Sequence, residues 1–363
     1  MKKIAFLIER LHVGGAEKVL LEYIKLLSST SRYSLLVITS KDNKDAFLCQ
    51  EIMKYAQYAF LIEDDEGRHS NFITKIRRSL NRKAKLKFLL TDCDVIVDFL
   101  DADFHKYIKN FKNKKITWLH SSFINLEKRK RSIRAKCDGY EDIVLICQDM
   151  RAEVEPLNVP WWNRTSVIYN PFDFSLMESE ALNYSKLTSR EKGFLSCEYI
   201  LSVSRLDEKT KDISGLIKAF SIARENGLNK KLFIIGDGED RRWLEELSNN
   251  LGLRKEIVFL GQQSNPYVWM KHASSFVLSS KGEGFGLVLV EALFLTGSVI
   301  STDCPVGPSE ILERGSLGAL YQMGDCEGLA KLLCNPPPKL ENVDLKKYSK
   351  ERLLHDIISL LEK

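Results

Sequence analysis

A glycine-rich turn between a buried strand and an apolar helix is the feature that most constrains this chain. The apolar or small residues Ser275–Ser279 predict a buried strand, and the turn Gly282–Gly286 follows. The apolar run Leu287–Leu295 then predicts a helix. This order places free backbone N–H groups and the positive end of a helix dipole at the mouth of a parallel sheet. We therefore expect an anionic ligand group at this turn.

Two glutamates accompany the turn. Glu283 lies in it, and Glu291 lies eight positions later inside the apolar run. A carboxylate among apolar side chains is unfavourable unless it is paired or hydrogen-bonded. Sugar and ribose hydroxyls are suitable partners, because one carboxylate can accept from two neighbouring hydroxyls. A core helix with a chance glutamate is the alternative.

Length and composition limit the remaining possibilities. The 363 residues suit two domains of about 170 residues each. The chain is 44% hydrophobic and 28% charged, as a globular protein is, and its net charge of +5 does not indicate nucleic acid binding. Eight cysteines without a CxxC pair indicate reduced thiols rather than disulfides or a zinc site. We expect no signal peptide and no membrane span, and hence a cytoplasmic protein.

The first half repeats the strand, glycine turn and helix. Ile4–Ile8 predicts a strand, Gly14 and Gly15 form the turn, and Glu17–Leu27 predicts a helix. The turn is not a GxGxxG fingerprint, which disfavours a dinucleotide-dependent oxidoreductase; a plain turn is the alternative. Further strands are predicted at Tyr33–Thr39, Asp94–Leu100, Lys115–Leu119, Ile143–Cys147 and Thr165–Ile168.

His120 follows the predicted strand Lys115–Leu119, at the edge where parallel sheets bind ligands. A structural role for a lone histidine is equally compatible with the sequence. The acidic triplets Asp92–Asp94 and Asp101–Asp103 have the DxD form that can hold a metal. We interpret them instead as turn and cap acids, and we expect no metal cofactor.

Two basic segments stand out in the first half. Arg68–Lys87 carries eight lysines and arginines and no acid, with apolar residues at roughly helical spacing. Such a basic amphipathic helix fits an anionic membrane surface, although a solvated helix face is equally compatible. Lys128–Lys136 would contact a phosphorylated or lipid-linked acceptor, or only water.

In the second half, the predicted strand Tyr199–Ser204 ends at Arg205, and Lys209 and Lys211 follow. The turn at Gly236 would approach a phosphate or ribose, and the polar segment Phe174–Cys197 is interpreted as a hinge. Further strands are predicted at Lys231–Ile235, Ile257–Leu260 and Val299–Ser301, and helices at Leu216–Ala223, Tyr267–His272 and Leu345–Leu361.

Several of these motifs resemble glycosyltransferase family 4: the Glu283 and Glu291 pair, the GGAE tetrapeptide at 14–17, His120 and Arg205. The resemblance implies a retaining enzyme with the α/β GT-B fold, in which two Rossmann-like domains face each other across a cleft. Residues 1–172 would form the acceptor-side domain and 173–344 the donor-binding domain. The final helix, within 345–363, would pack back on the first domain.

The resemblance also implies roles for single residues. Arg205 and Lys211 would hold the donor pyrophosphate, with Lys209 as the alternative to Lys211 because this loop is longer than usual. Glu291 would hold the ribose and Glu283 the donor sugar. The implied catalytic residues are Glu283, His120, Arg205 and Lys211; the donor-binding residues are Arg205, Lys211, Gly236, Gly284, Phe285, Gly286, Leu287, Glu291 and Gly15; and the acceptor-side residues are Gly14, Gly15 and His120.

The implied reaction moves a hexose or N-acetylhexosamine from a nucleotide sugar, expected to be a UDP-sugar, to a glycan or lipid-linked saccharide. Its place would be cell-surface polysaccharide synthesis, for capsule, lipopolysaccharide or exopolysaccharide, at the inner face of the membrane. A glycoside hydrolase that uses Glu283 and Glu291 is one alternative, although it would have no use for Arg205 and Lys211. A non-catalytic nucleotide-sugar binding subunit is another.

Overall fold

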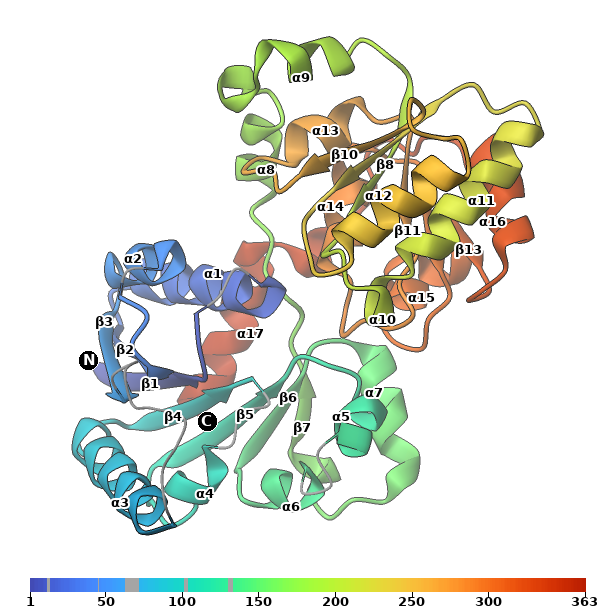
Figure 1. Ribbon diagram of the computed structural model, residues 1–363. Helices are drawn as coiled ribbons and strands as arrows, with labels where there is room; N and C mark the ends of the chain where they lie inside the picture. Colours follow the sequence, from blue (N-terminus) through green and yellow to red (C-terminus); the bar gives the residue numbers. More distant parts are fainter. Residues whose placement is uncertain (12–13, 45, 63–71, 101–103, 130–132) are drawn as a thin grey trace. The chain divides into compact units, whose positions relative to one another are not determined.

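The computed structural model describes residues 1–11, 14–44, 46–62, 72–100, 104–129 and 133–363. These residues form two compact units (Figure 1). Unit 1 consists of Met1–Phe172 and Lys347–Lys363, and unit 2 consists of Asp173–Lys346.

Within the described residues, unit 1 contains a seven-stranded parallel sheet of order β3-β2-β1-β4-β5-β6-β7. The central strands β1, β4 and β5 are largely apolar and buried, as expected of a parallel sheet with helices on both faces, whereas the edge strands β3 and β7 are only partly buried. The strand order changes direction between β1 and β4, the kind of position where open parallel sheets bind ligands. The strands are β1 (Lys2–Ile8), β2 (Tyr33–Lys41), β3 (Gln57–Ile62), β4 (Val95–Phe99), β5 (Lys114–Leu119), β6 (Asp142–Leu145) and β7 (Thr165–Val167).

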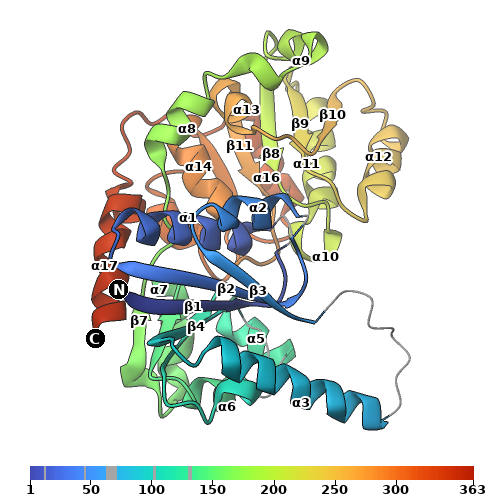
Figure 2. The same cartoon turned by 90° about the vertical axis from the view of Figure 1, so that its left-hand side faces the viewer.

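Helices α1 and α3 lie on opposite faces of this sheet (Figures 1 and 2). The last helix, α17, packs against the rest of unit 1, where Lys2 and Lys114 donate to the carbonyl oxygens of Leu361 and Leu360 at 2.6 and 2.9 Å. Lysines at a helix carboxyl end satisfy its unpaired carbonyls and complement its dipole. The helices are α1 (Gly15–Ser29), α2 (Phe47–Met53), α3 (Phe72–Leu89), α4 (His105–Ile108), α5 (Phe123–Arg129), α6 (Ile133–Asp138), α7 (Gln148–Val154) and α17 (Lys350–Glu362).

Unit 2, all of whose residues are described, contains a six-stranded parallel sheet of order β10-β9-β8-β11-β12-β13. Its direction changes between β8 and β11. The strands are β8 (Tyr199–Val203), β9 (Lys231–Ile235), β10 (Ile257–Gly261), β11 (Ser275–Leu278), β12 (Val299–Thr302) and β13 (Ala319–Tyr321). The helices are α8 (Phe174–Glu180), α9 (Ser189–Phe194), α10 (Glu208–Lys211), α11 (Ile213–Glu225), α12 (Arg241–Asn250), α13 (Tyr267–His272), α14 (Leu287–Leu295), α15 (Pro308–Ile311) and α16 (Cys326–Cys334).

The interpretation of Phe174–Cys197 as a hinge is wrong. This segment forms α8 and α9 and belongs to unit 2. Thr188 and Glu191 form a capping box at the start of α9, and the ring of Phe194 packs 5.5 Å from that of Phe233. The segment is polar because its helices are short and lie at the surface, so polarity alone did not distinguish it from a linker.

Other predictions differ from the structure in smaller ways. The sequence did not indicate β3, α2 or β13, and the final helix begins at Lys350 rather than Leu345. Parts of three predicted motifs, at 68–71, 101–103 and 130–131, lie outside the described residues. In the part of the chain that the structure describes, no helix has both the length and the apolar character needed to cross a bilayer.

Candidate functional site

The loops that follow β8 and β11 are joined by hydrogen bonds at the point where the sheet of unit 2 changes direction. The Ser279 hydroxyl donates to the Lys211 carbonyl at 2.8 Å, and the Lys281 N–H donates to the Thr210 carbonyl at 2.8 Å. The Thr302 hydroxyl, at the end of β12, donates to the Ser280 carbonyl at 2.6 Å. These bonds fix α10 and the glycine-rich turn to each other as one assembly.

An ion pair lies within this assembly. The Lys211 Nζ is 2.5 Å from the Oε1 of Glu283, and the Ser280 hydroxyl donates to the same oxygen at 2.6 Å. The two charged side chains are only 17% and 12% exposed, so water screens their attraction weakly. Of the two candidate lysines, the structure brings Lys211 to the turn, whereas Lys209 binds the N-cap Asp207 through its backbone.

Arg205 follows β8 and projects into solvent. Its side chain is 69% exposed and lies 3.3 Å from the Oδ2 of Asp207. An exposed pair of this kind contributes little free energy, so the guanidinium can exchange Asp207 for a phosphate at low cost. The structure therefore places two cations in the segment between β8 and α11: Arg205 just after β8 and Lys211 at the last position of α10.

The loop after β12 packs against the backbone of the glycine-rich turn and fixes its conformation. Gly286 is the N-cap of α14 with φ of 97°, a left-handed conformation that favours glycine. A Cβ on Gly307 would lie 1.9 Å from the carbonyl oxygen of Phe285, so the loop after β12 packs directly against the turn. The α14 amides next to Gly286 lie at the positive end of the helix dipole, as expected for an anion site.

Glu291 lies on the accessible stripe of α14 with Leu287 and Val288, whereas Leu289, Val290, Ala292 and Leu293 are buried. The hydroxyl of Tyr267, at the start of α13, donates to its Oε1 at 3.3 Å. The carboxylate is thus hydrogen-bonded, as its apolar surroundings require. Its predicted ribose role stays a prediction.

Gly236 has a structural reason to be glycine. Its φ is 134°, and a Cβ there would lie 1.8 Å from the carbonyl oxygen of Ser204. The backbone of the β9 turn therefore packs against the end of β8. Nothing in this packing requires a ligand, and the donor-binding role of Gly236 stays a prediction.

In unit 1, Gly14 is the N-cap of α1 and Gly15 is its exposed first residue, close after β1. His120 follows β5, is 9% exposed, and its ring lies 4.5 Å from that of Phe99. Burial lowers the pKa of His120 to about 3, so the ring is neutral at pH 7. Among the described residues, its buried Nε2 has no hydrogen-bond partner, as expected of a group that a ligand would satisfy.

The second basic cluster, Lys128–Lys136, is partly neutralised. Lys136 is buried and pairs with Asp98 of β4 at 3.0 Å, and Arg134 pairs with Glu127. Acceptor contact through Lys136 is therefore wrong, because its ammonium group is not accessible. Nothing in the local sequence indicated this pair, because Asp98 and Lys136 lie far apart in the chain.

Three further residues that lie near the predicted donor-binding residues of unit 2 were not predicted. Ser280 and Tyr267 bind the two glutamates, and Lys281 pairs with Asp212 at 3.0 Å. Ser280 and Lys281 directly precede the turn, so proximity in sequence was a usable signal for them. Tyr267 lies 24 positions before Glu291, and only the packing of α13 on α14 brings them together.

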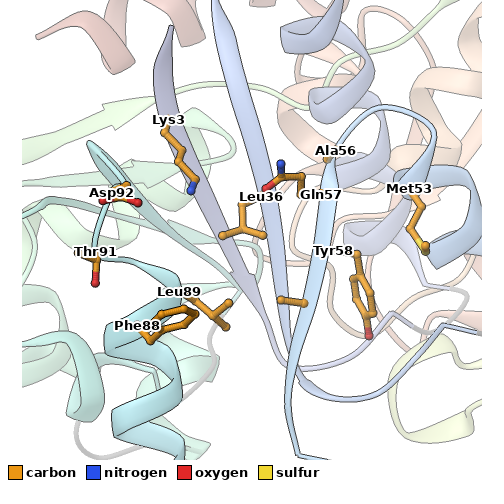
Figure 3. A pocket seen from close by; sticks show the side chains of 11 residues that line it. Lys3, Leu36, Met53, Ala56, Gln57, Tyr58, Phe88, Leu89, Thr91 and Asp92 are labelled. Carbon is orange, nitrogen blue, oxygen red and sulfur yellow. The ribbon is translucent and has the colours of Figure 1, made fainter.

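Figure 3 shows a hollow of unit 1 and the side chains that line it. It is lined by Lys3 and Leu36 of the sheet and by Phe88 and Leu89 of α3, among others. None of the predicted site residues lines it. The hollow is an incompletely covered part of the sheet face, and we base no catalytic role on it.

Helix α3 exposes both basic and apolar side chains. Lys83, Lys85 and Lys87 are exposed, and so are Leu80 and Phe88, at 62% and 80%. This composition is as predicted for a basic amphipathic helix.

Residues 188–335, most of unit 2, match the family described as glycosyl transferases group 1. An uncharacterized glycosyltransferase of Methanocaldococcus jannaschii is 34% identical over 175 residues, which span 48% of this chain and 42% of that relative. The lipopolysaccharide 1,6-galactosyltransferase of Salmonella typhimurium is 26% identical over 332 residues, 89% of this chain and 86% of that relative.

Among solved structures, HepE of Anabaena in complex with UDP and glucose superimposes with a TM-score of 0.78. It is 19% identical, and the similarity covers 100% of both chains. This likeness confirms the predicted fold class. The family match and the similarity to a galactosyltransferase along most of its length identify the chain as a glycosyltransferase, and the structural likeness identifies its fold as GT-B.

Proposed function

We propose that this glycosyltransferase is a retaining enzyme of family 4, which moves a hexose or N-acetylhexosamine from a UDP-sugar to a glycan or lipid-linked saccharide of the cell surface. One observation carries the proposal: the Lys211 ammonium group and the Ser280 hydroxyl both donate to the Oε1 of Glu283. A phosphate-binding cation and a hydroxyl-binding carboxylate thus lie side by side beside a helix amino end. A nucleotide sugar presents both groups.

In the proposed complex, the pyrophosphate binds Arg205, Lys211 and the backbone amides of the turn at 284–287. Arg205 can bind two oxygens in its planar fork, while Lys211 acts as a point charge. When the glycosidic bond breaks, negative charge grows on the leaving phosphate. These cations and amides stabilise that charge more than they stabilise the bound donor, which lowers the barrier.

The two glutamates bind the hydroxyl groups of the donor. Glu291 accepts from the ribose, and Glu283 accepts from the sugar. The Oε1 of Glu283 already accepts from Lys211 and Ser280, so this carboxylate is arranged as a hydrogen-bond acceptor rather than as the general acid of a hydrolase.

Retention is explained by attack on the same face as the leaving group. The acceptor oxygen bonds to the anomeric carbon as the bond to the phosphate oxygen breaks, and the leaving phosphate takes the acceptor proton. We assign Gly14, Gly15 and His120 to the acceptor side. A neutral His120 can exchange a hydrogen bond with a substrate hydroxyl but does not carry charge at pH 7.

The relatives support the choice of substrates. The HepE structure contains UDP and glucose, and the Salmonella relative is named for galactosyl transfer to lipopolysaccharide. We extend these classes to this chain as a UDP-sugar donor and a lipid-linked glycan acceptor, with no metal cofactor and a location at the inner face of the membrane.

A thermal-shift panel of UDP, GDP and ADP, with and without magnesium, tests the donor assignment. We expect UDP to stabilise the protein independently of magnesium, and Glu291→Ala to abolish the shift. Stabilisation by no nucleotide, or only with magnesium, would contradict the proposal. The anomeric configuration of the product, read by NMR, and a search for a covalent sugar on a carboxylate test retention.

The membrane contact is tested separately with vesicles. The protein should sediment with phosphatidylglycerol vesicles but not with phosphatidylcholine vesicles, because each lysine near an anionic surface contributes about 1 kcal/mol. Replacing Lys83, Lys85 and Lys87 by serine should abolish sedimentation without changing UDP binding. Equal sedimentation of the triple variant would exclude α3 as the contact.

A further inference from the structure

The hydrogen bond between Tyr267 and Glu291 joins α13 to the carboxylate that we assign to the ribose. The Tyr267 hydroxyl donates to the Oε1 of Glu291 at 3.3 Å, and both side chains are partly exposed. We propose that Tyr267 is a positioning residue, which orients the Glu291 carboxylate to accept both hydroxyls of a ribose. This inference rests on the proposed function, because it takes Glu291 as the ribose-binding residue.

Tyr267 is held in place by its own neighbours. Its N–H donates to the Oδ1 of Asn265 at 3.2 Å, and the Asn265 side chain donates to the Glu180 carbonyl at 2.7 Å. Asn265 is only 4% exposed. The amino end of α13 is therefore anchored to the end of α8 by a buried amide, and the position of the phenol follows from that anchor.

The other ends of the two helices are also tied. The hydroxyl of Thr296, just after α14, donates to the Met270 carbonyl of α13 at 2.7 Å, and this bond is buried. Trp269 and Met270 are fully buried beside it. Because α13 and α14 are joined at two points, the separation of the phenol and the carboxylate is set by packed helices rather than by a loop.

The Glu291 carboxylate needs a partner that restricts its orientation. Its terminal torsion is broad, so a carboxylate on an accessible helix stripe samples many orientations. Ordering a side chain of this kind on ligand binding costs about 0.5–1.5 kcal/mol. A hydrogen bond from a phenol that packed helices hold offsets part of that cost before the ligand arrives and favours one orientation of the carboxylate.

The experiment compares Tyr267→Phe with the wild-type protein by calorimetric titration of UDP and of 2′,3′-dideoxyuridine diphosphate. We expect about two- to fivefold weaker binding of UDP and unchanged binding of the dideoxy nucleotide, which has no hydroxyls for Glu291. In turnover, the KM for the donor should rise while kcat changes little. The matched control is Tyr184→Phe, which removes another phenol of unit 2 with a 3.3 Å contact, here to His272.

The outcomes separate this inference from the proposed function. If Glu291→Ala leaves UDP affinity unchanged, the ribose assignment fails and the inference fails with it. If Glu291→Ala weakens UDP but Tyr267→Phe does not, the positioning role alone is wrong. If Tyr267→Phe weakens both nucleotides equally, its role is general packing and the inference is overturned. The double variant should bind UDP no more weakly than Glu291→Ala, because Tyr267 acts through Glu291.

Discussion

Protonation of the unfolded chain at His120 should make unit 1 lose stability in mild acid. Burial lowers the pKa of this histidine from 6.5 to about 3 in the folded protein. Above pH 6.5 the histidine is mostly neutral in both states, and its burial lowers the stability little. As the pH falls from 6.5 toward 3, the unfolded state binds the proton more readily than the folded state, and the free energy of unfolding decreases. Between pH 7.5 and 4.5 the unfolded state gains nearly one proton that the folded state does not bind, which removes about 2.7 kcal/mol, at about 1.36 kcal/mol for each pH unit below 6.5.

The test is His120→Phe, which keeps a ring against Phe99 and removes the titrating group. Amide exchange in β5, measured at pH 7.5 and 4.5 and corrected for intrinsic rates, reports the opening of unit 1 separately from unit 2. The opening free energy of the wild type should fall by about 2–3 kcal/mol more than that of the variant. The exposed His355→Gln serves as the control, with a wild-type pH response. If the opening free energy of His120→Phe falls as much as that of the wild type, protonation of His120 does not cause the loss of stability.

Three further changes test other parts of the structure. Arg205→Ala should slow transfer by about 10² in kcat with unchanged thermal stability, since its side chain is exposed; an unchanged rate would remove it from the leaving-group site. Gly307→Ala should displace the glycine-rich turn and abolish UDP binding, because a Cβ there would lie 1.9 Å from the carbonyl oxygen of Phe285. The control is Gly252→Ala, with φ of 73° and no atom within 4 Å of the new Cβ, which should cost only about 1–2 kcal/mol of stability. Equal effects of the two variants in calorimetry would refute the clash with Phe285. Lys136→Met should destabilise the protein by about 3–5 kcal/mol in urea unfolding, because it leaves Asp98 buried without its cation, and adding Asp98→Asn should restore part of the loss.

The sequence predicted the elements whose pattern is local. Buried parallel strands such as Ile4–Ile8 and Lys231–Ile235 are continuous apolar runs, so their periodicity identified them. Glycine turns after strands predicted where a ligand would bind, and that location stays a prediction. The segment Phe174–Cys197 failed because short surface helices and linkers share a polar composition. There, the capping pair of Thr188 and Glu191 was the better signal.

Pairings between distant residues could not be predicted in this way. Lys136 lies in a run of basic residues, and nothing near it in the sequence indicates that it is buried in an ion pair with Asp98. The choice between Lys209 and Lys211 likewise depends on Glu283, which lies on another loop. Local spacing places a residue on an element, but only the packing of elements decides which charges meet.

The meeting of Lys211 with Glu283 leads to a last prediction. In the structure the lysine is already paired with a carboxylate, so a pyrophosphate must compete with Glu283 for it. Glu283→Gln removes the competing charge and should tighten UDP binding about fivefold, equivalent to about 1 kcal/mol. Transfer should nevertheless slow by about 10², because an amide is a weaker acceptor for sugar hydroxyls in the transition state. Weaker UDP binding in this variant would mean that Glu283 orients Lys211 rather than competing with the phosphate. Opposite changes in affinity and rate would show that the carboxylate lowers nucleotide affinity and serves the sugar.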